Sequence, residues 1–137
     1  MTRAPASGTG EPYDHLPADR QLIYHLTSRG DWERAREAGE YRVSTLGLTL
    51  EEVGFIHCST ASQVAGVANR FYRGQTDLVL LTIDQGRVRP EVRYEAALDS
   101  DEAFPHVYGP LNVDAVVGAA PLEPGPDGAF VTPPSRP

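Results

Sequence analysis

The feature that most constrains the fold is an almost continuous apolar run of strand length at residues 77–84, which reads DLVLLTID. Strands that are half exposed alternate apolar and polar residues, whereas strands covered on both faces lose that alternation. The run therefore predicts a central strand that is buried on both faces, with the rest of the domain built around it.

Other segments have the composition and alternation of strands, while one is too rich in proline and glycine for a regular element. The predicted strands are 21–27, 54–60, 91–96 and 113–120, with a possible brief strand at 41–44. Residues 103–111, AFPHVYGPL, are expected to form an ordered loop.

Helix signals occur at three places. The best helical pattern begins at Thr60, where Thr60 and Gln63 have capping-box spacing, and apolar residues then recur with helical period until Gly74. A short helix is predicted over 31–38 after an Asp31 N-cap, and a helical turn is predicted to begin at Thr49. The order of strands and helices lacks strict alternation, so we expect an α+β fold with mostly antiparallel sheet.

The distribution of prolines sets the domain limits. Nine of the twelve prolines lie in residues 1–20 or 121–137. Such segments are typical of irregular tails. We therefore expect a flexible tail over 1–19, a single domain over 20–122 and a Pro/Gly-rich tail over 123–137.

Composition excludes several classes of function. Twelve basic and nineteen acidic residues give a formal charge of −7, which disfavours binding to nucleic acid. All the basic residues are arginine, so lysine Schiff-base chemistry and a P-loop are excluded. The single cysteine, Cys58, rules out an internal disulfide and a thiolate zinc cluster, and burial as a small hydrophobe is its expected role. No stretch approaches the ~18 apolar residues of a membrane span, and we expect a cytoplasmic protein.

Three histidines lie within the predicted domain, each two residues before a polar side chain: His25, His57 and His106. An extended backbone points residues i and i+2 to the same face. Because imidazole exchanges protons near neutral pH, a cleft that holds several of them is suited to acid–base chemistry or to ligand binding.

Less specific interpretations stand beside this one. His25 and His57 also fit core histidines bonded to backbone carbonyls, Tyr108 also fits a core aromatic, and Glu95 also fits a solvated strand face. A zinc site formed by the three histidines is possible in principle, but the spacings HxH and HExxH are absent, and no metal is expected.

Five phrases, in order, carry a resemblance to a known family: IYHLTSRGDWERAREAGEY, EEVGFIHCST, RFYRGQTDLVLLTID, VRYEAA and FPHVYGPLN. Over about residues 22–122 the chain resembles the bacterial family called Domain of Unknown Function 952. That family's fold is similar to the ADP-ribosyltransferase fold, a compact α+β domain in which two small sheets surround a cleft that holds NAD in the transferases. The resemblance implies two or three short helices and small split sheets around such a cleft.

The resemblance also implies roles for particular residues. His25 matches the residue that orients the nicotinamide ribose, Ser59 or Thr60 matches the middle-strand hydroxyl, and Glu95 could match the carboxylate that stabilises an oxocarbenium-like transition state. The Glu-x-Glu and Gln-x-Glu pairs of the transferases are absent. Arginines and aromatic residues that could bind the diphosphate and form a wall of the site are Arg42, Arg70, Tyr24 and Tyr108.

Three hypotheses for function follow. In the first, the chain is an ADP-ribosyltransferase-like enzyme that binds NAD or a related nucleotide, with His57 or His106 in proton transfer. In the second, His57, His106 and Tyr108 perform acid–base catalysis on a small metabolite without NAD. In the third, the chain binds a small molecule without catalysis. The sequence leaves the substrate and the oligomeric state open.

Overall fold

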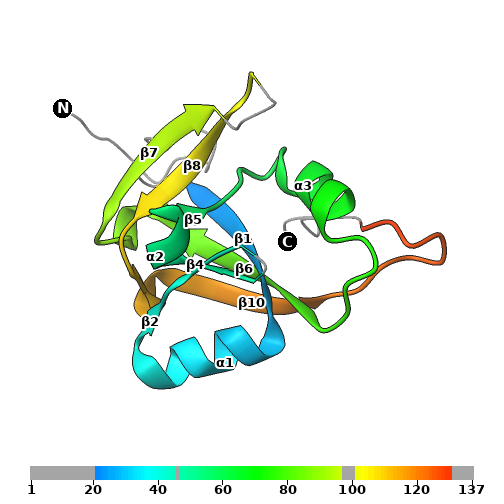
Figure 1. Cartoon of the computed structure of the whole chain (residues 1–137), viewed down its shortest axis with the longest axis horizontal. Helices are drawn as coiled ribbons and strands as arrows, with labels where there is room; N and C mark the ends of the chain where they lie inside the picture. The colour runs from blue at the N-terminus through cyan, green and yellow to red at the C-terminus, as the bar shows by residue number, and fades with distance from the viewer. Residues whose placement is uncertain (1–20, 46, 97–100, 131–137) are drawn as a thin grey trace, which may run out of the picture.

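A computed structural model of the chain describes residues 21–45, 47–96 and 101–130. These residues form a small α+β domain of mostly antiparallel sheets, as expected (Figure 1). The strands are β1 (Leu22–Ser28), β2 (Glu40–Tyr41), β3 (Val43–Thr45), β4 (Leu48–Thr49), β5 (Ile56–His57), β6 (Leu78–Asp84), β7 (Glu91–Ala96), β8 (Ala103–Tyr108), β9 (Leu111–Asn112) and β10 (Val116–Leu122). The α-helices are α1 (Arg29–Ala38), α2 (Leu50–Val53) and α3 (Val64–Phe71).

The apolar run forms β6, the central strand of the sheet β1-β6-β10, and its prediction is confirmed. Both neighbours run antiparallel to it. Alternate β6 side chains enter two separate apolar clusters: Val79 and Leu81 join one that contains Ala35 of α1, and Leu80 joins one that contains Ala68 of α3. Figure 1 shows α1 and α3 on opposite sides of this sheet, so burial on both faces explains the lost alternation of the run.

Helices α1 and α2 begin at side-chain caps. The hydroxyl of Ser28, not Asp31, caps α1 by accepting a hydrogen bond from the Asp31 amide, so the helix starts two residues earlier than predicted. Gly39 ends α1 in the left-handed conformation, with φ 89°. Helix α2 begins at the predicted capping box between Thr49 and Glu52.

Helix α3 is shorter than the sequence predicts. The Gln63 side chain does accept a hydrogen bond from the Thr60 amide, but it also donates to the carbonyl of Ala103. Residues 61–63 form a turn, and the helix begins only at Val64. Because Ala103 lies 40 positions from Gln63 along the chain, a local pattern cannot indicate this contact.

The predicted loop at 103–111 is wrong, because residues 103–108 form β8, the middle strand of the sheet β5-β8-β7. Proline is unusual in a middle strand because it lacks an amide donor. The carbonyl of Pro105 accepts from the Cys58 amide, one residue beyond the end of β5. A residue in an antiparallel strand directs its amide and its carbonyl to the same neighbouring strand. Pro105 therefore lacks its amide donor at the position where the pairing with β5 ends.

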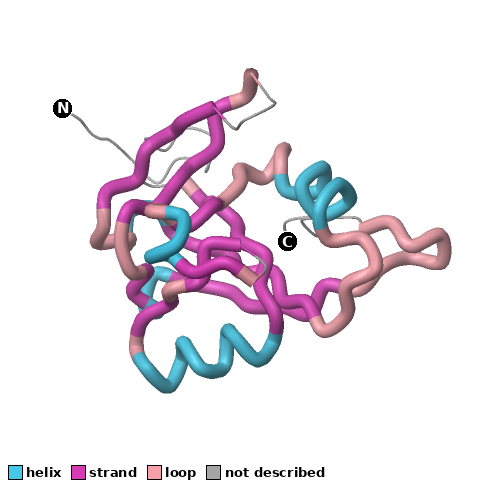
Figure 2. Tube along the Cα trace, viewed as in Figure 1, coloured by secondary structure: helices cyan, strands magenta, loops and turns pink. Residues whose placement is uncertain are grey.

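Strand β5 is also shorter than the predicted strand 54–60. After it, Ser59 forms an isolated bridge with Tyr24 of β1, which links the small sheet to the large one. Figure 2 shows the hairpin arms β7 and β8 extending away from the larger sheet.

The packed part of the chain continues past residue 122, where the predicted domain ends. Phe130 is 3% exposed within the α3 cluster. Its amide donates to the Asn69 side chain, which in turn donates to the Phe130 carbonyl. The predicted tail over 1–19 lies outside the described residues. In the described part of the chain, no helix is long and apolar enough to cross a membrane.

Candidate functional site

The candidate site lies on one face of the sheet β5-β8-β7. Cross-strand neighbours share a face, and His57 lies opposite His106, which in turn lies opposite Arg93. Because side chains alternate between the two faces of a strand, the residues two positions before and after these three lie on the same face. Together the strands and the residue before β5 provide Phe55, His57, Glu91, Arg93, Glu95, Phe104, His106 and Tyr108.

Strand pairing explains why the two imidazoles meet. Because Cys58 and Pro105 are joined by a backbone hydrogen bond, the adjacent pair His57 and His106 is the pair without backbone hydrogen bonds between β5 and β8. Side chains of such a pair approach more closely than those of a bonded pair. The His57 Nδ1 and His106 Nε2 atoms are 3.3 Å apart.

A carboxylate completes this contact. Glu95 Oε1 lies 2.8 Å from His106 Nδ1 and accepts a hydrogen bond from the Tyr108 hydroxyl at 2.5 Å. We call Glu95, His106 and His57 the relay. An ionised carboxylate only accepts hydrogen bonds, so a neutral His106 ring would carry its proton on Nδ1 and accept at Nε2. His57 therefore donates from Nδ1, and its Nε2 is left with the lone pair.

The relay is buried in its middle and partly exposed at both ends. The His106 side chain is 4% exposed and that of Glu95 is 36% exposed, whereas His57 has intermediate burial. Hydrogen bonds from Tyr108 and His106 hold the pKa of the Glu95 carboxyl below its usual range, so it is ionised at neutral pH. Burial, with a smaller contribution from His106, lowers the pKa of His57 to about 4, so its ring is neutral at pH 7.

Aromatic rings hold the two imidazoles in place. The Phe55 ring stacks on His106 with centroids 4.0 Å apart and an angle of 15° between planes. Phe104 lies against His57 with a centroid distance of 5.2 Å. The Arg93 guanidinium lies 4.4 Å from the centre of the Tyr108 ring, on the same face of the sheet.

His25 lies in the core behind β5, not in the relay. Its Nδ1 is 2.6 Å from the carbonyl oxygen of His57, so Nδ1 carries the proton and donates. Its Nε2 accepts from the Tyr41 hydroxyl at 2.7 Å. Burial lowers the pKa of His25 to about 4 and raises the pKa of Tyr41. Both ring nitrogens of His25 are thus occupied, and the residue holds the backbone that carries His57.

The other predicted binding residues lie outside the relay. Tyr24 and Ser59 are buried and joined through their backbones at the bridge between the sheets. The Thr60 hydroxyl lies 3.3 Å from that of Ser62, and Arg70 lies over the Phe71 ring on α3.

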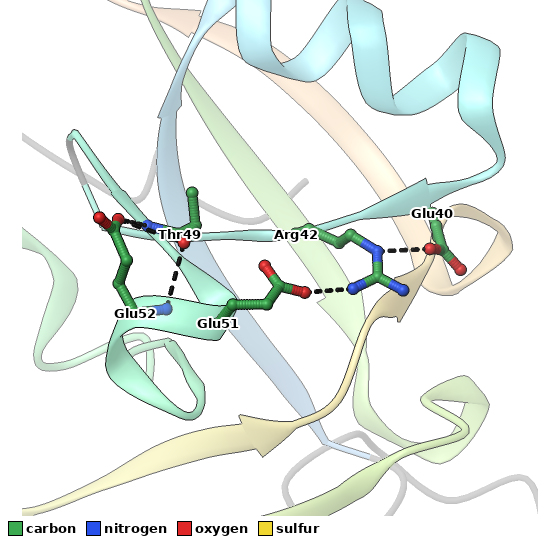
Figure 3. A network of polar contacts seen from close by, with 5 residues as sticks. All are labelled: Glu40, Arg42, Thr49, Glu51 and Glu52. Carbon is green, nitrogen blue, oxygen red and sulfur yellow. Dashed lines mark hydrogen bonds and ion pairs between the residues drawn. The ribbon is translucent and has the colours of Figure 1, made fainter.

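Arg42 is engaged in a separate surface network (Figure 3). Its guanidinium bonds Glu40 at 2.6 Å and also pairs with Glu51 of α2, next to the capping box that begins α2. Two carboxylates therefore neutralise the charge that the sequence analysis assigned to a diphosphate.

Residues that the sequence analysis did not select are Phe55, Phe104, Arg93 and Tyr41. The sequence could have indicated Phe55 and Arg93, because each lies two residues from a selected residue in a predicted strand and so shares its face. Phe104 belongs to β8, which was predicted as a loop, and so had no assigned face. Tyr41 contacts His25 across the core, and no local spacing could have indicated that contact.

An open pocket of about 330 Å³ lies elsewhere and contains none of the predicted site residues. It is lined by Gly39, Glu40, Arg89, Pro90, Pro110 and Asn112. Within the described ranges, no group of three or more His, Cys, Asp or Glu residues is arranged to hold a metal ion.

Comparison with known proteins adds a family and a fold. The model of the family described as "Protein of unknown function (DUF952)" matches residues 26–119. The chain is similar to protein CC0527 from Caulobacter crescentus: the crystal structure matches with a TM-score of 0.71 and 33% identity over 81% of this chain and 94% of that chain. Its solution NMR structure matches with a TM-score of 0.67 and 34% identity over 79% and 90%. No significant match was found among curated proteins.

Proposed function

Because this chain belongs to the DUF952 family, whose function is unknown, we propose its function from the site: it is an acid–base catalyst that acts on a small molecule. The observation that carries the proposal is the continuous hydrogen-bonded relay from Glu95 through His106 to His57. A carboxylate that orients one imidazole is a recurrent arrangement in general-base catalysis, and here a second imidazole extends it.

His57 is the group that meets the substrate. Its Nδ1 is occupied by the bond to His106, and its Nε2 has no hydrogen-bond partner in the described part of the chain. An O–H or N–H group of a bound molecule gives its proton to Nε2. His57 then passes the Nδ1 proton to His106 Nε2, and the positive charge comes to rest on the ring beside Glu95.

This transfer compensates for the weak basicity of His57. A buried imidazole with a pKa of about 4 resists protonation because burial disfavours its charged form. Moving the charge to His106 places it 2.8 Å from an ionised carboxylate. Tyr108 bonds the same carboxylate oxygen and fixes its position.

The remaining contacts are positioning contacts. Phe55 restricts the plane of His106 by stacking, and His25 fixes the carbonyl of His57 through its own bond to Tyr41. Preorganised donors and acceptors act without reorganisation during a reaction.

Histidine tautomers test this proposal directly. Long-range ¹⁵N–¹H NMR correlations distinguish a proton on Nδ1 from one on Nε2, and we expect Nδ1 protons on both His57 and His106 at neutral pH. The Glu95→Gln variant should weaken the preference of His106, whereas Glu91→Gln should leave it unchanged. Glu91 is a matched control because it lies on the same strand and face but pairs with Arg93. A proton on His57 Nε2 in the wild type would refute the relay.

Turnover provides the second test. Screening small esters, glycosides and nucleotides should reveal a reaction that is lost in His57→Gln and strongly reduced in Glu95→Gln, but retained in Glu91→Gln. A ligand that binds equally to all these proteins without turnover would instead identify a binding module.

A second candidate function is cleavage of the glycosidic bond of NAD on an ADP-ribosyltransferase-like fold. It is favoured by Glu95, a partly exposed and ionised carboxylate, which is the group needed to stabilise an oxocarbenium-like transition state. His57 or His106 would then move the proton, with Tyr108 as an aromatic wall.

Thermal stability in the presence of NAD, ADP-ribose and nicotinamide separates this candidate from the first. A ligand at about 100 times its dissociation constant stabilises the native state by about 2.7 kcal/mol. A clear rise in Tm with NAD in both the wild type and Glu95→Gln would support it. An unchanged Tm with all three compounds at millimolar concentration would exclude it.

A further inference from the structure

The outer edge of the small sheet is formed by β7. Among the described residues, β7 is hydrogen-bonded in a ladder with β8 only. Glu91, Arg93, Tyr94 and Ala96 are exposed, and Figure 1 shows β7 at the periphery of the molecule. An exposed edge strand presents unpaired amides and carbonyls that can pair with another chain.

The backbone pattern identifies which groups are available. The bond between Cys58 and Pro105 means that Pro105 faces β5, so its neighbour His106 faces β7 and forms a bonded pair with Arg93. Alternation then directs the amides and carbonyls of Val92, Tyr94 and Ala96 outward. This set of three residues is the β7 edge.

We propose that the β7 edge is a self-association surface, on which a second copy of the chain adds its own β7 antiparallel, with Tyr94 opposite the partner's Tyr94. In this register Arg93 lies opposite the partner's Glu95, and Val92 lies opposite the partner's Ala96. The two small sheets thereby become one continuous sheet of six strands.

Charge and the position of Pro90 favour this register over two others that the outward groups allow. Placing Arg93 opposite the partner's Arg93 would also place Glu91 opposite the partner's Glu95, so that every facing pair of charges repels. Placing Val92 opposite the partner's Val92 would pair Tyr94 with the partner's Pro90, which has no amide to donate. The register centred on Tyr94 makes two ion pairs between opposite charges and uses three amides of each copy.

The proposed dimer brings a partner residue to the candidate site. The carboxylate of Glu95 accepts hydrogen bonds from His106 and Tyr108 within its own chain, and the partner's Arg93 would lie beside it. The association itself does not rest on the proposed function, because it depends only on the backbone and charges of β7.

Sedimentation velocity of the full chain tests the proposal. We expect a monomer–dimer equilibrium within the range from about 5 to about 500 µM, the affinity range of small interfaces. Since exposed ion pairs are screened by salt, about 0.5 M NaCl should weaken the dimer. A monomer throughout this range would overturn the proposal.

Two matched pairs of variants locate the interface. Val92→Pro removes an outward amide and should abolish the dimer, whereas Val92→Ala keeps that amide and should retain it. Arg93→Glu makes like charges face each other and should also give a monomer, whereas Arg36→Glu makes the same change in net charge on exposed α1 and should not. A dimer that survives both Val92→Pro and Arg93→Glu would place the interface elsewhere and refute the proposal.

Hydrogen exchange on the wild type does not depend on whether the variants fold. The amides of Val92, Tyr94 and Ala96 should become protected as the protein concentration rises, while those of Arg93 and Glu95, already bonded to β8, should not change. Protection of the β7 edge that is equal at all concentrations would mean that another part of the same chain covers it, and would overturn the proposal.

Discussion

Lowering the pH from about 7.5 to about 5 should remove more stability from this protein than from its His25→Gln variant. The imidazole of His25 is buried, with its pKa lowered from 6.5 to about 4 in the folded state. In the unfolded chain the same group binds a proton near pH 6.5. The unfolded state therefore holds more protons than the native state between these two values, and stability falls as the pH decreases through that window.

The magnitude follows from the two pKa values. At about pH 5, an imidazole with a pKa of 6.5 unfolded and about 4 folded costs about 2 kcal/mol of unfolding free energy, whereas at about pH 7.5 it costs less than about 0.1 kcal/mol. Below pH 4 both states are protonated and the loss reaches a plateau. His57 titrates in the same direction in the wild type and in the variant, so the difference between them isolates His25.

Urea unfolding at several pH values measures this difference. The amide side chain introduced by His25→Gln does not titrate, so this variant loses some stability at every pH but follows a flatter curve. With a denaturant slope of about 1.5 kcal/mol/M, the extra loss in the wild type corresponds to a midpoint shift of about 1.3 M. The His25 ring signals in NMR should not titrate between pH 7.5 and 5. Parallel curves for the two proteins, or a ring that titrates near pH 6.5, would contradict the buried and neutral state of His25.

Three further predictions concern other parts of the structure. Phe130→Ala should lower the free energy of unfolding by about 3–5 kcal/mol in urea titrations, as expected for a buried aromatic side chain, whereas a loss under about 1 kcal/mol would mean that residues after 122 do not pack on the domain. Thr49→Ala should cost about 1 kcal/mol by the same measurement because it removes the cap of α2, and an unchanged midpoint would show that the capping box contributes nothing. The Cys58 thiol, whose pKa burial raises to about 12, should react with a thiol reagent at about pH 8 only after unfolding, so rapid labelling of the native protein would contradict its position in the core.

Strand β6 and the start of α2 were predictable because their signals are local. The run that forms β6 has no polar side chain in its middle except Thr82, and the pairing of Thr49 with Glu52 spans three residues. Signals of this kind need no knowledge of the rest of the fold. The start of α3 was wrong because Gln63 also bonds Ala103, a contact between distant parts of the chain.

The small sheet was less predictable because its middle strand contains a proline. In isolation, Pro105 argues against a middle strand, and the same residue is compatible with β8 only because β5 ends beside it. The alternation of residues did assign His57 and Glu95 to the faces of their own strands. It could not show that His106 lies between them, since strand order and register depend on all three strands together.

The register of β8 decides both the candidate site and the β7 edge. Shifting it by one residue would turn His106 toward the core and place Val107, which is fully buried, on the face that carries the relay. Burial of Val107 and Ile56 therefore fixes the imidazoles in contact, and by the alternation of hydrogen bonds it also fixes Val92, Tyr94 and Ala96 at the edge. The apolar residues on the core-facing side of β5 and β8 thus specify the polar arrangement on the opposite side of the small sheet.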